Sequence, residues 1–291
     1  MVAPRVIQLG TEATAHPQRR QRGHYRHVGT CPACQRAARL RGDAPAGMRS
    51  WATFLDTIGA VRGFEHILDA VRTGRPGFDA AHGTTLFEWL DRHPDAAAAF
   101  DSAMSERTAA FAPSVAVGYD FSDVRSVVDV GGGRGTLLVD ILRHHAHIEG
   151  VLFELPAVAA RARGGLEGTD VRERCKVIAG DFFGRVPEGA DRYVLANVLH
   201  DWNDAESTVI LRNCRRAMAK HGRVLIVERR IPDRDGDAIP TLLSDINMLV
   251  ITGGKERTDV EYAALLEAAG LRLGAVKPAA FPYCLIEGAA A

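Results

Sequence analysis

The sequence lacks several features that would point to particular classes of protein. No apolar run approaches the roughly 18 to 20 residues needed to cross a bilayer, and the N-terminus has no apolar core of a signal peptide. Neither sign of charge is in excess, because 36 Lys and Arg balance 36 Asp and Glu. This balance gives no electrostatic reason to expect nucleic acid or an anionic membrane as a partner.

Cysteine is also scarce, with five residues, an odd number, in a chain of 291. Three of them, Cys175, Cys214 and Cys284, are scattered singly through apolar segments, which favours reduced structural thiols over a disulfide framework. We therefore expect a cytoplasmic protein with no membrane and no nucleic-acid partner. Hydrophobic residues make up 46% and charged residues 25%, so the chain can form one large domain or a domain with a smaller helical part.

The charge balance conceals a basic first segment. Residues 1–42 contain eight arginines and one acid, with little apolar periodicity, so we expect this segment to be disordered. It includes His24, His27, Cys31 and Cys34, which together are a possible zinc set. The loop between the two pairs is much shorter than finger-type zinc sites use, and we expect no metal site. A basic arm for RNA or a transit peptide stays a minor alternative.

Residues 43–118 have the pattern of a helical subdomain. Apolar residues recur at near-helical spacing from 51 to 71, with a break expected at Gly63. Residues 74–83 are rich in glycine and proline and predict a connection. Two further helices are expected at residues 86–90 and 96–111, separated by Pro94.

Beyond residue 118 the chain alternates between short apolar runs and helical stretches. Continuous apolar strands that alternate with helices predict a doubly wound α/β fold with a parallel sheet covered on both faces. Residues 119–291 are therefore expected to form one domain, with an antiparallel pair of strands at one edge. The expected strands are residues 124–130, 150–153, 176–179, 192–199, 223–228, 271–276 and 283–287.

The turn after the first strand, in "VVDVGGGRGTLL", is where such a fold binds its ligand. Gly131, Gly133 and Gly135 allow the backbone to approach a ligand closely. The dinucleotide fingerprint needs a small residue three positions after the second glycine, but Thr136 stands there. Asp129 precedes the turn, and its charge opposes a pyrophosphate but suits a ligand with ammonium and sulfonium charges, such as S-adenosylmethionine.

Two more acids follow the next two strands. Glu154 in "VLFELP" can accept hydrogen bonds from ribose hydroxyls, and Asp181 in "GDFF" can accept from an adenine amino group while Phe182 covers the ring. Each acid taken singly is equally well explained as a helix cap or a solvated loop residue. Three acids after three successive strands, beside the glycine turn, favour S-adenosylmethionine over NAD.

The fourth strand leads into a polar cluster, "VLANVLHDWND". With "VVDVGGGRG", "LFELP", "GDFF" and "GGKERT", in this order and spacing, it resembles the S-adenosylmethionine-dependent O-methyltransferases of the caffeate, hydroxyneurosporene and antibiotic type. The resemblance runs from about residue 43 to the C-terminus. It implies a class I methyltransferase fold and methylation of hydroxyl groups on phenols, polyketides and related small molecules.

Site residues carry over from the resemblance by motif. His200 corresponds to the general base, flanked by Glu228 and Glu256, and Asp201 to the acid beside the base. The residues that correspond to the lining of the cofactor are Gly131, Glu154, Asp181 and Phe182. From their place in the glycine turn, we expect Asp129 and Gly133 to bind the cofactor as well. Met104 and Met248 correspond to walls of the acceptor pocket, although a lone methionine on a helix is more often part of the core.

The chain departs from the family pattern at two places. Ala196 stands where plant members have lysine, so that cofactor contact is missing or is supplied otherwise. Family members also carry an N-terminal winged-helix dimerisation domain, whose pattern residues 1–42 do not show. We therefore expect at most a homodimer weakened by this difference.

The chemistry explains why a histidine suits this position. A phenol with a pKa near ~10 reacts faster as it loses its proton, and a histidine with a reference pKa of ~6.5 is mostly neutral and can accept it. A carboxylate at the other ring nitrogen fixes the tautomer, and Glu228 is favoured because the fifth strand should end beside the fourth. The alternatives are a structural histidine near a helix start capped by Asn203 or Asp204, a related enzyme that catalyses hydroxylation or decarboxylation, and a non-catalytic remnant that binds the cofactor or nothing.

Overall fold

The computed structural model describes residues 49–57, 59–232 and 238–290. The basic segment 1–42 and the possible zinc ligands lie outside these ranges. Within them, the C-terminal part is built on a seven-stranded sheet with the order β3-β2-β1-β4-β5-β7-β6. The strands are β1 Ser126–Val130, β2 Glu149–Glu154, β3 Cys175–Ala179, β4 Arg192–Ala196, β5 Arg223–Arg229, β6 Leu271–Pro278 and β7 Tyr283–Ala290.

The first five strands are parallel, and β1 lies between β2 and β4 where the strand order reverses. Such strands are buried on both faces, and the continuous apolar runs of β1, β4 and β5 reflect this. At the other edge, β7 runs antiparallel to both β5 and β6. The predicted doubly wound fold with an antiparallel pair at one edge is confirmed.

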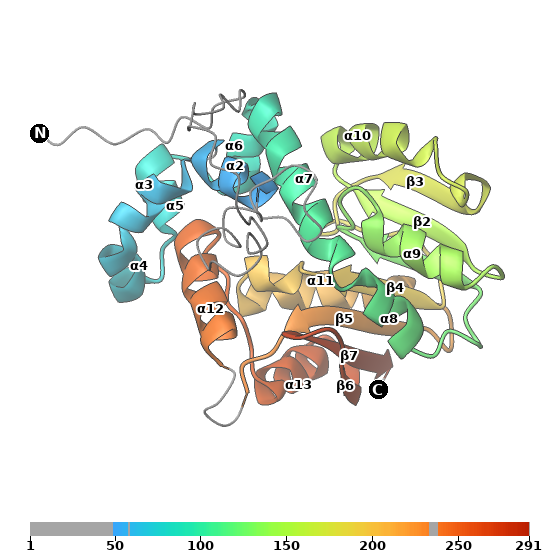
Figure 1. Ribbon diagram of the computed structural model, residues 1–291. Coiled ribbons are helices and arrows are strands. Elements are labelled where there is room, and N and C mark those ends of the chain that lie inside the picture. Colours follow the sequence, from blue (N-terminus) through green and yellow to red (C-terminus); the bar gives the residue numbers. More distant parts are fainter. Residues whose placement is uncertain (1–48, 58, 233–237, 291) are drawn as a thin grey trace, which may run out of the picture.

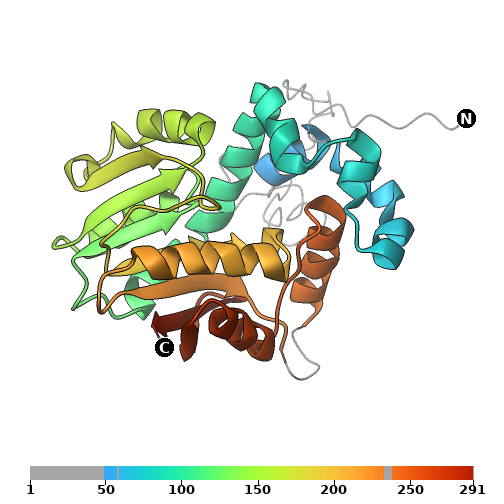
Figure 2. The same ribbon diagram turned by 180° about the vertical axis from the view of Figure 1, so that it is seen from behind.

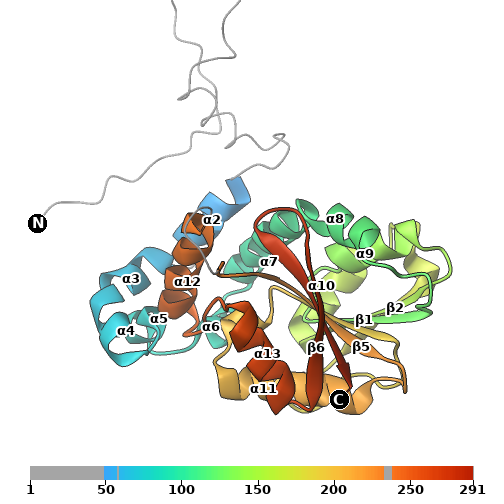
Figure 3. The ribbon, with the colours of Figure 1, turned by 90° about the horizontal axis from the view of Figure 1, so that it is seen from below.

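Helices cover both faces of the sheet (Figure 3). One face packs against α8 Ala112–Gly118, α9 Thr136–His144 and α10 Pro156–Leu166. The opposite face packs against α11 Asp204–Ala217 and α13 Asp259–Ala268, and Figure 2 shows α11 lying across it. The result is a three-layer arrangement whose parallel strands all end at the same edge.

The remaining helices form a separate group beside that edge (Figure 1). α12 comes after β5 in the chain but packs against α3, α4 and α5. No helix in the described ranges is long and apolar enough to cross a membrane. The helices of this group are α2 Arg49–Thr57, α3 Ala60–Glu65, α4 Ile67–Thr73, α5 Gly77–His82, α6 Leu86–Arg92, α7 Pro94–Ala109 and α12 Ile239–Ile251.

Two local predictions in this group were wrong. Gly63 does not break a helix but lies inside α3, and the chain is interrupted at Gly59 and His66 instead. The glycine-rich connection of residues 74–83 contains α5. A side chain on Gly77 would collide with the Gly63 carbonyl, so these glycines allow α3 and α5 to pack closely rather than disrupt them.

The ends of the other elements follow local rules. Thr258 and Glu261 form a capping box at the start of α13, and Gly270 follows this helix with φ 76°. The strand predicted over residues 192–199 ends earlier, at Ala196. Its apolar run continues as Val198 and Leu199, but Asn197 has φ 54° and turns the chain out of the sheet.

Candidate active site

His200 lies in a short 3-10 turn, η2 Leu199–Asp201, which begins three residues after the last residue of β4. The side chain is buried, with 3% of the residue exposed. Asn203, rather than His200, caps the following helix α11, because its side chain accepts the Glu206 amide at 3.0 Å. The imidazole is therefore not used in capping.

Glu228, at the end of β5, contacts this turn with both carboxylate oxygens. Its Oε1 accepts the amides of Val198 and Leu199 at 2.8 and 2.9 Å. Its Oε2 lies 2.9 Å from Nδ1 of His200. Because β5 pairs with β4 in parallel register, the two strand ends lie side by side, and one carboxylate both holds the turn and faces the imidazole.

Glu256 and Asp201 complete the charged cluster around His200. Glu256 Oε1 lies 3.8 Å from Nδ1, and Asp201 Oδ1 lies 3.8 Å from Nε2. Glu256 belongs to the "GGKERT" loop, which packs against the His200 turn so closely that a side chain on Gly254 would collide with the His200 carbonyl. The fold thus joins two motifs that are more than fifty residues apart.

Burial and the neighbouring charges set the protonation of this cluster. Burial acts to lower the pKa of His200, but the charges of Glu228, Asp201 and Glu256 outweigh it and raise the pKa to about 9. Burial raises the pKa of Asp201 to about 6. The free protein therefore holds a protonated imidazole at neutral pH, which differs from the mostly neutral histidine expected from the sequence.

Arg257 supports the same turn and was not singled out by the sequence analysis. Its fully buried guanidinium donates to the carbonyls of Leu199 and Trp202 at 2.8 and 2.7 Å and to Oδ1 of Asp204 at 3.0 Å. It thereby ties the "GGKERT" loop to the residues on both sides of His200. The signal in the sequence was its place in the "GGKERT" motif.

The glycine turn follows β1, the strand at which the strand order reverses. Asp129 is buried beneath it, and neither carboxylate oxygen has a hydrogen-bond partner among the described residues. A side chain on Gly132 would collide with this carboxylate, a constraint that the sequence analysis missed. Burial and the charge of Glu154 raise the pKa of Asp129 to about 7.

Glu154 and Phe182 adjoin the same turn. Oε1 of Glu154 accepts the Gly133 amide at 2.9 Å, and burial raises the pKa of this carboxyl to about 7. A side chain on Gly131 would contact the Phe182 ring at 3.5 Å. Asp181, after β3, accepts the Phe183 amide at 2.8 Å. An orphaned buried carboxylate, a tight glycine turn and an adjacent aromatic ring fit a cationic nucleoside cofactor.

The two methionines and Ala196 are less closely tied to these groups. Met104, on α7, packs against the apolar cluster of the helical group, and Met248 is buried in α12. Both placements are also those of ordinary core residues. Ala196 is partly buried and packs against the cluster on the α9 face of the sheet.

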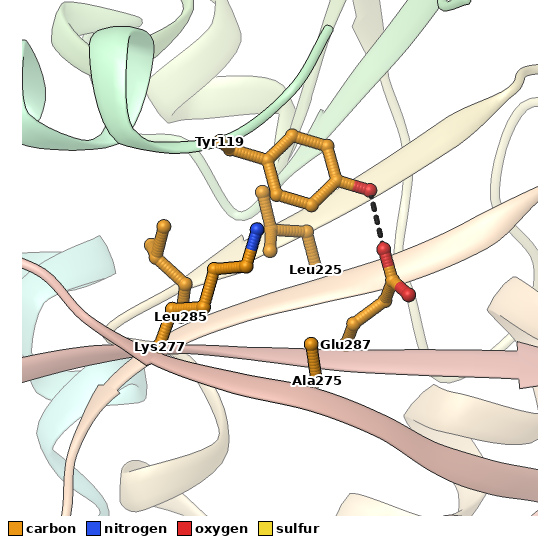
Figure 4. A pocket seen from close by; sticks show the side chains of 6 residues that line it. All are labelled: Tyr119, Leu225, Ala275, Lys277, Leu285 and Glu287. Carbon is orange, nitrogen blue, oxygen red and sulfur yellow. Dashed lines mark hydrogen bonds between the residues drawn. The ribbon is translucent and has the colours of Figure 1, made fainter.

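A small recess elsewhere on the sheet is not a candidate for the acceptor site. It encloses about 20 Å³, room for about one water molecule. Within it the Tyr119 hydroxyl donates to Glu287 at 2.7 Å. Figure 4 shows its lining by Tyr119, Leu225, Ala275, Lys277, Leu285 and Glu287.

A possible set of metal ligands in the described part of the chain is formed by His200, Glu228 and Glu256. One ligand atom from each lies within 4.8 Å of the others, and all three residues are buried. Two carboxylates and one imidazole are suitable ligands for a divalent cation. The 2.9 Å contact between His200 and Glu228 is equally suited to orienting the imidazole.

Comparisons with known proteins identify the family. The O-methyltransferase domain family matches residues 64–272. O-demethylpuromycin-O-methyltransferase of Streptomyces alboniger is 42% identical over 258 residues, covering 86% of this chain and 68% of the relative. Aclacinomycin 10-hydroxylase RdmB of Streptomyces purpurascens is 40% identical over 236 residues, covering 79% of this chain and 62% of the relative.

A solved structure has the same fold. NcsB1, an O-methyltransferase from neocarzinostatin biosynthesis in complex with S-adenosylmethionine and 2-hydroxy-5-methyl naphthoic acid, matches with a TM-score of 0.80 and 34% identity. The match covers 88% of this chain and 76% of that one. Fold, site and comparisons define the class, an S-adenosylmethionine-dependent O-methyltransferase of secondary metabolism. The chain belongs to the O-methyltransferase domain family.

Proposed function

We propose that His200 is the general base of this methyltransferase and that the acceptor is a hydroxyl group on an aromatic, polyketide-type small molecule. The observation that carries the proposal is the contact between His200 and Glu228. Nδ1 lies 2.9 Å from a carboxylate oxygen, and we propose that Nδ1 keeps its proton beside this charge and leaves Nε2 to accept the proton of the acceptor. The same carboxylate accepts hydrogen bonds from two amides of the turn. In this proposal, Glu228 therefore sets both the position and the tautomer of the imidazole.

S-adenosylmethionine supplies the methyl group and a neutral leaving group. The chain then has to hold the acceptor oxygen in line with the methyl group and remove the proton of the acceptor. Correct positioning of the two reactants accounts for much of the rate enhancement in such a displacement. A base with a pKa of about 9 is well matched to a phenol with a pKa of ~10, because proton transfer between them is nearly balanced. His200 has to lose its own proton first.

The cofactor residues follow from the glycine turn. We propose that Asp129 supplies negative charge beneath the turn. The residues proposed to hold the cofactor are Gly131, Gly133, Glu154, Asp181 and Phe182. The support is that Glu154 and Phe182 adjoin this turn and that the Asp129 oxygens lack partners among the described residues. Ala196 cannot make the contact that lysine makes in plant members, so that contact is missing or is supplied by another residue.

The acceptor class rests on the relatives. NcsB1 was solved with a naphthoic acid, and the Streptomyces alboniger relative is named for a demethylpuromycin. Asp201 adjoins the base, and Met104 and Met248 are proposed to face the acceptor from α7 and α12. A panel of phenols and naphthols with labelled cofactor tests this class.

The test of the base compares His200→Ala with His144→Ala, an exposed histidine on α9. We expect His200→Ala to slow methyl transfer by about 10²- to 10⁴-fold, the usual contribution of a general base, with unchanged S-adenosylmethionine affinity by calorimetry. His144→Ala should behave like the unaltered protein. Unchanged turnover in His200→Ala would return this residue to a structural role.

Hydroxylation is the second candidate, because RdmB, a hydroxylase, is 40% identical to this chain. Decarboxylation within the same fold belongs to this alternative as well. The discriminating measurement is S-adenosylhomocysteine, which accumulates in step with methylated product if methyl is transferred. Intact cofactor with oxygen consumed or carbon dioxide released would instead support the alternative.

We propose that no metal takes part, although His200, Glu228 and Glu256 have suitable ligand chemistry. The 2.9 Å contact between Nδ1 of His200 and Glu228 supports this proposal, because it gives both groups a role that needs no cation. Methyl transfer should continue unchanged after dialysis against EDTA. Loss of activity that returns with a divalent cation would contradict the proposal.

We propose a homodimer in the cytoplasm. α12 presents an exposed apolar face, Ile239, Leu242, Leu243 and Ile246, at helical spacing, and such faces often mark contact surfaces. Light scattering of the full chain should give the mass of two copies, and Leu243→Glu should give one copy. A monomer in the unaltered protein would contradict this assembly.

A further inference from the structure

The residue that ends β4 has an unusual backbone conformation. Asn197 has φ 54°, and it is the one residue other than glycine with a positive φ in the part of the chain that the structure describes. Most side chains avoid this region, and asparagine is among the few that enter it. Its amide donates to the Val227 carbonyl at 3.1 Å, so the chain changes direction while still bonded to β5. Asn197 therefore sets the direction in which the chain leaves the sheet toward His200.

The side chain of Asn197 is held by Arg107 of α7. Nη2 of Arg107 donates to Oδ1 of Asn197 at 3.0 Å, and Nε donates to the Tyr283 hydroxyl at 2.7 Å. The guanidinium is planar with donors in fixed directions, so two bonds define its position. The contact joins α7 to the ends of β4 and β7.

The same helix is anchored at a second point, nearer the glycine turn. Oδ2 of Asp101 lies 2.6 Å from Nε of Arg161 on α10 and 4.0 Å from Nε of Arg134 in the turn itself. Asp101 and Arg107 are six residues apart, about 9 Å along a helix. α7 thus connects the loop proposed for the cofactor with the turn that carries His200.

We propose that Arg107 and Asn197 are positioning residues for His200. Arg107 fixes the Asn197 side chain, and Asn197 fixes the turn that presents the imidazole to the acceptor oxygen. Neither residue accepts the proton. The proposal rests on His200 being the general base. It predicts that both residues act on the rate of methyl transfer and leave cofactor affinity unaltered.

Substitutions at Asn197 separate backbone conformation from the side-chain contact. Asn197→Asp keeps an acceptor oxygen and tolerance of positive φ, Asn197→Gly keeps only the tolerance, and Asn197→Ala loses both. We expect kcat to fall in that order, with Asp restoring most of the rate. Arg107→Ala should lower kcat by about 10- to 100-fold, the effect of a misplaced reacting group, while the KM for S-adenosylmethionine stays the same.

The matched control is Arg143→Ala, because Arg143 on α9 forms an exposed ion pair with Asp170 at 2.8 Å and, among the described residues, bonds to neither Asn197 nor His200. It should leave kcat unaltered. Thermal unfolding with saturating S-adenosylhomocysteine shows whether each variant folds and binds. Equal kcat in Arg107→Ala and the unaltered protein would overturn the proposal, and so would equal rates for Asn197→Asp and Asn197→Ala.

A double-mutant cycle with His200→Ala distinguishes this proposal from the proposed function. If Arg107 acts through His200, Arg107→Ala causes no further loss in the His200→Ala background. A full additional loss there would show that Arg107 acts elsewhere. If His200→Ala by itself retains turnover, His200 is not the base and the proposed function fails first.

Discussion

At the scale of single residues, the protonation of His200 governs the pH dependence of catalysis. Its pKa is raised to about 9 because three carboxyl groups surround it. For free enzyme, kcat/KM follows the ionisation of the essential base. We therefore expect kcat/KM to rise with pH and to level off near pH 9.

Glu228→Gln tests the source of this raised pKa. Glutamine keeps an oxygen that can accept the Val198 and Leu199 amides but removes the negative charge nearest to His200. The inflection of kcat/KM should move down by about 1–3 pH units, the usual effect of one adjacent opposite charge. Glu256→Gln is the control and should shift it less, because Glu256 lies 3.8 Å away. The same inflection in Glu228→Gln and the unaltered protein would show that Glu228 does not set the pKa.

At the scale of elements, the glycine turn depends on the residue packed beneath it. A side chain on Gly132 would collide with the Asp129 carboxylate. We expect Gly132→Ala to weaken S-adenosylhomocysteine binding by at least about tenfold, the equivalent of ~1.4 kcal/mol, as measured by calorimetry. Gly164→Ala, in α10 where nothing lies within 4 Å, should bind normally and unfold at the same or a higher temperature. Equal affinity in both variants would contradict the role of Gly132.

The sequence predicted the strands well because parallel strands are buried on both faces and read as continuous apolar runs. It predicted the end of β4 poorly, because Val198 and Leu199 continue the apolar run beyond Asn197. It missed α5 because the glycines of residues 74–83 are typical of a loop. In the structure, Gly77 instead allows α5 to pack closely on Gly63 of α3. Motifs identified His200, Glu228 and Glu256, whereas Arg107 and Asn197 could not be paired, since they lie 90 residues apart.

At the scale of the whole molecule, the site makes the free protein more stable at lower pH. The pKa is raised to about 7 for Asp129 and Glu154, about 6 for Asp201 and about 9 for His200. At these four groups the folded protein therefore binds protons more tightly than the unfolded chain does. Stability is lost as pH rises, from about 4 to 7 through the carboxyl groups and from about 6.5 to 9 through His200.

We expect the melting temperature of the free protein to fall between pH 5.5 and 8.5. The cationic cofactor favours the ionised carboxylates, so stabilisation by saturating S-adenosylmethionine should be larger at pH 8.5. Asp129→Asn should reduce the difference between the two pH values. A melting temperature that rises with pH would contradict these shifts, and no stabilisation by the cofactor at either pH would leave only a non-catalytic remnant.

In the proposed reaction, His200 removes the proton of the acceptor hydroxyl. The most direct measurement compares single-turnover methyl transfer by the unaltered protein and by His200→Ala from pH 6 to 10.5, with one phenolic acceptor. We expect a large deficit for His200→Ala at pH 7 to 8 that closes as pH approaches the pKa of the phenol, ~10, because an ionised acceptor needs no base. A deficit of constant size over this range, or none, would contradict this role of His200.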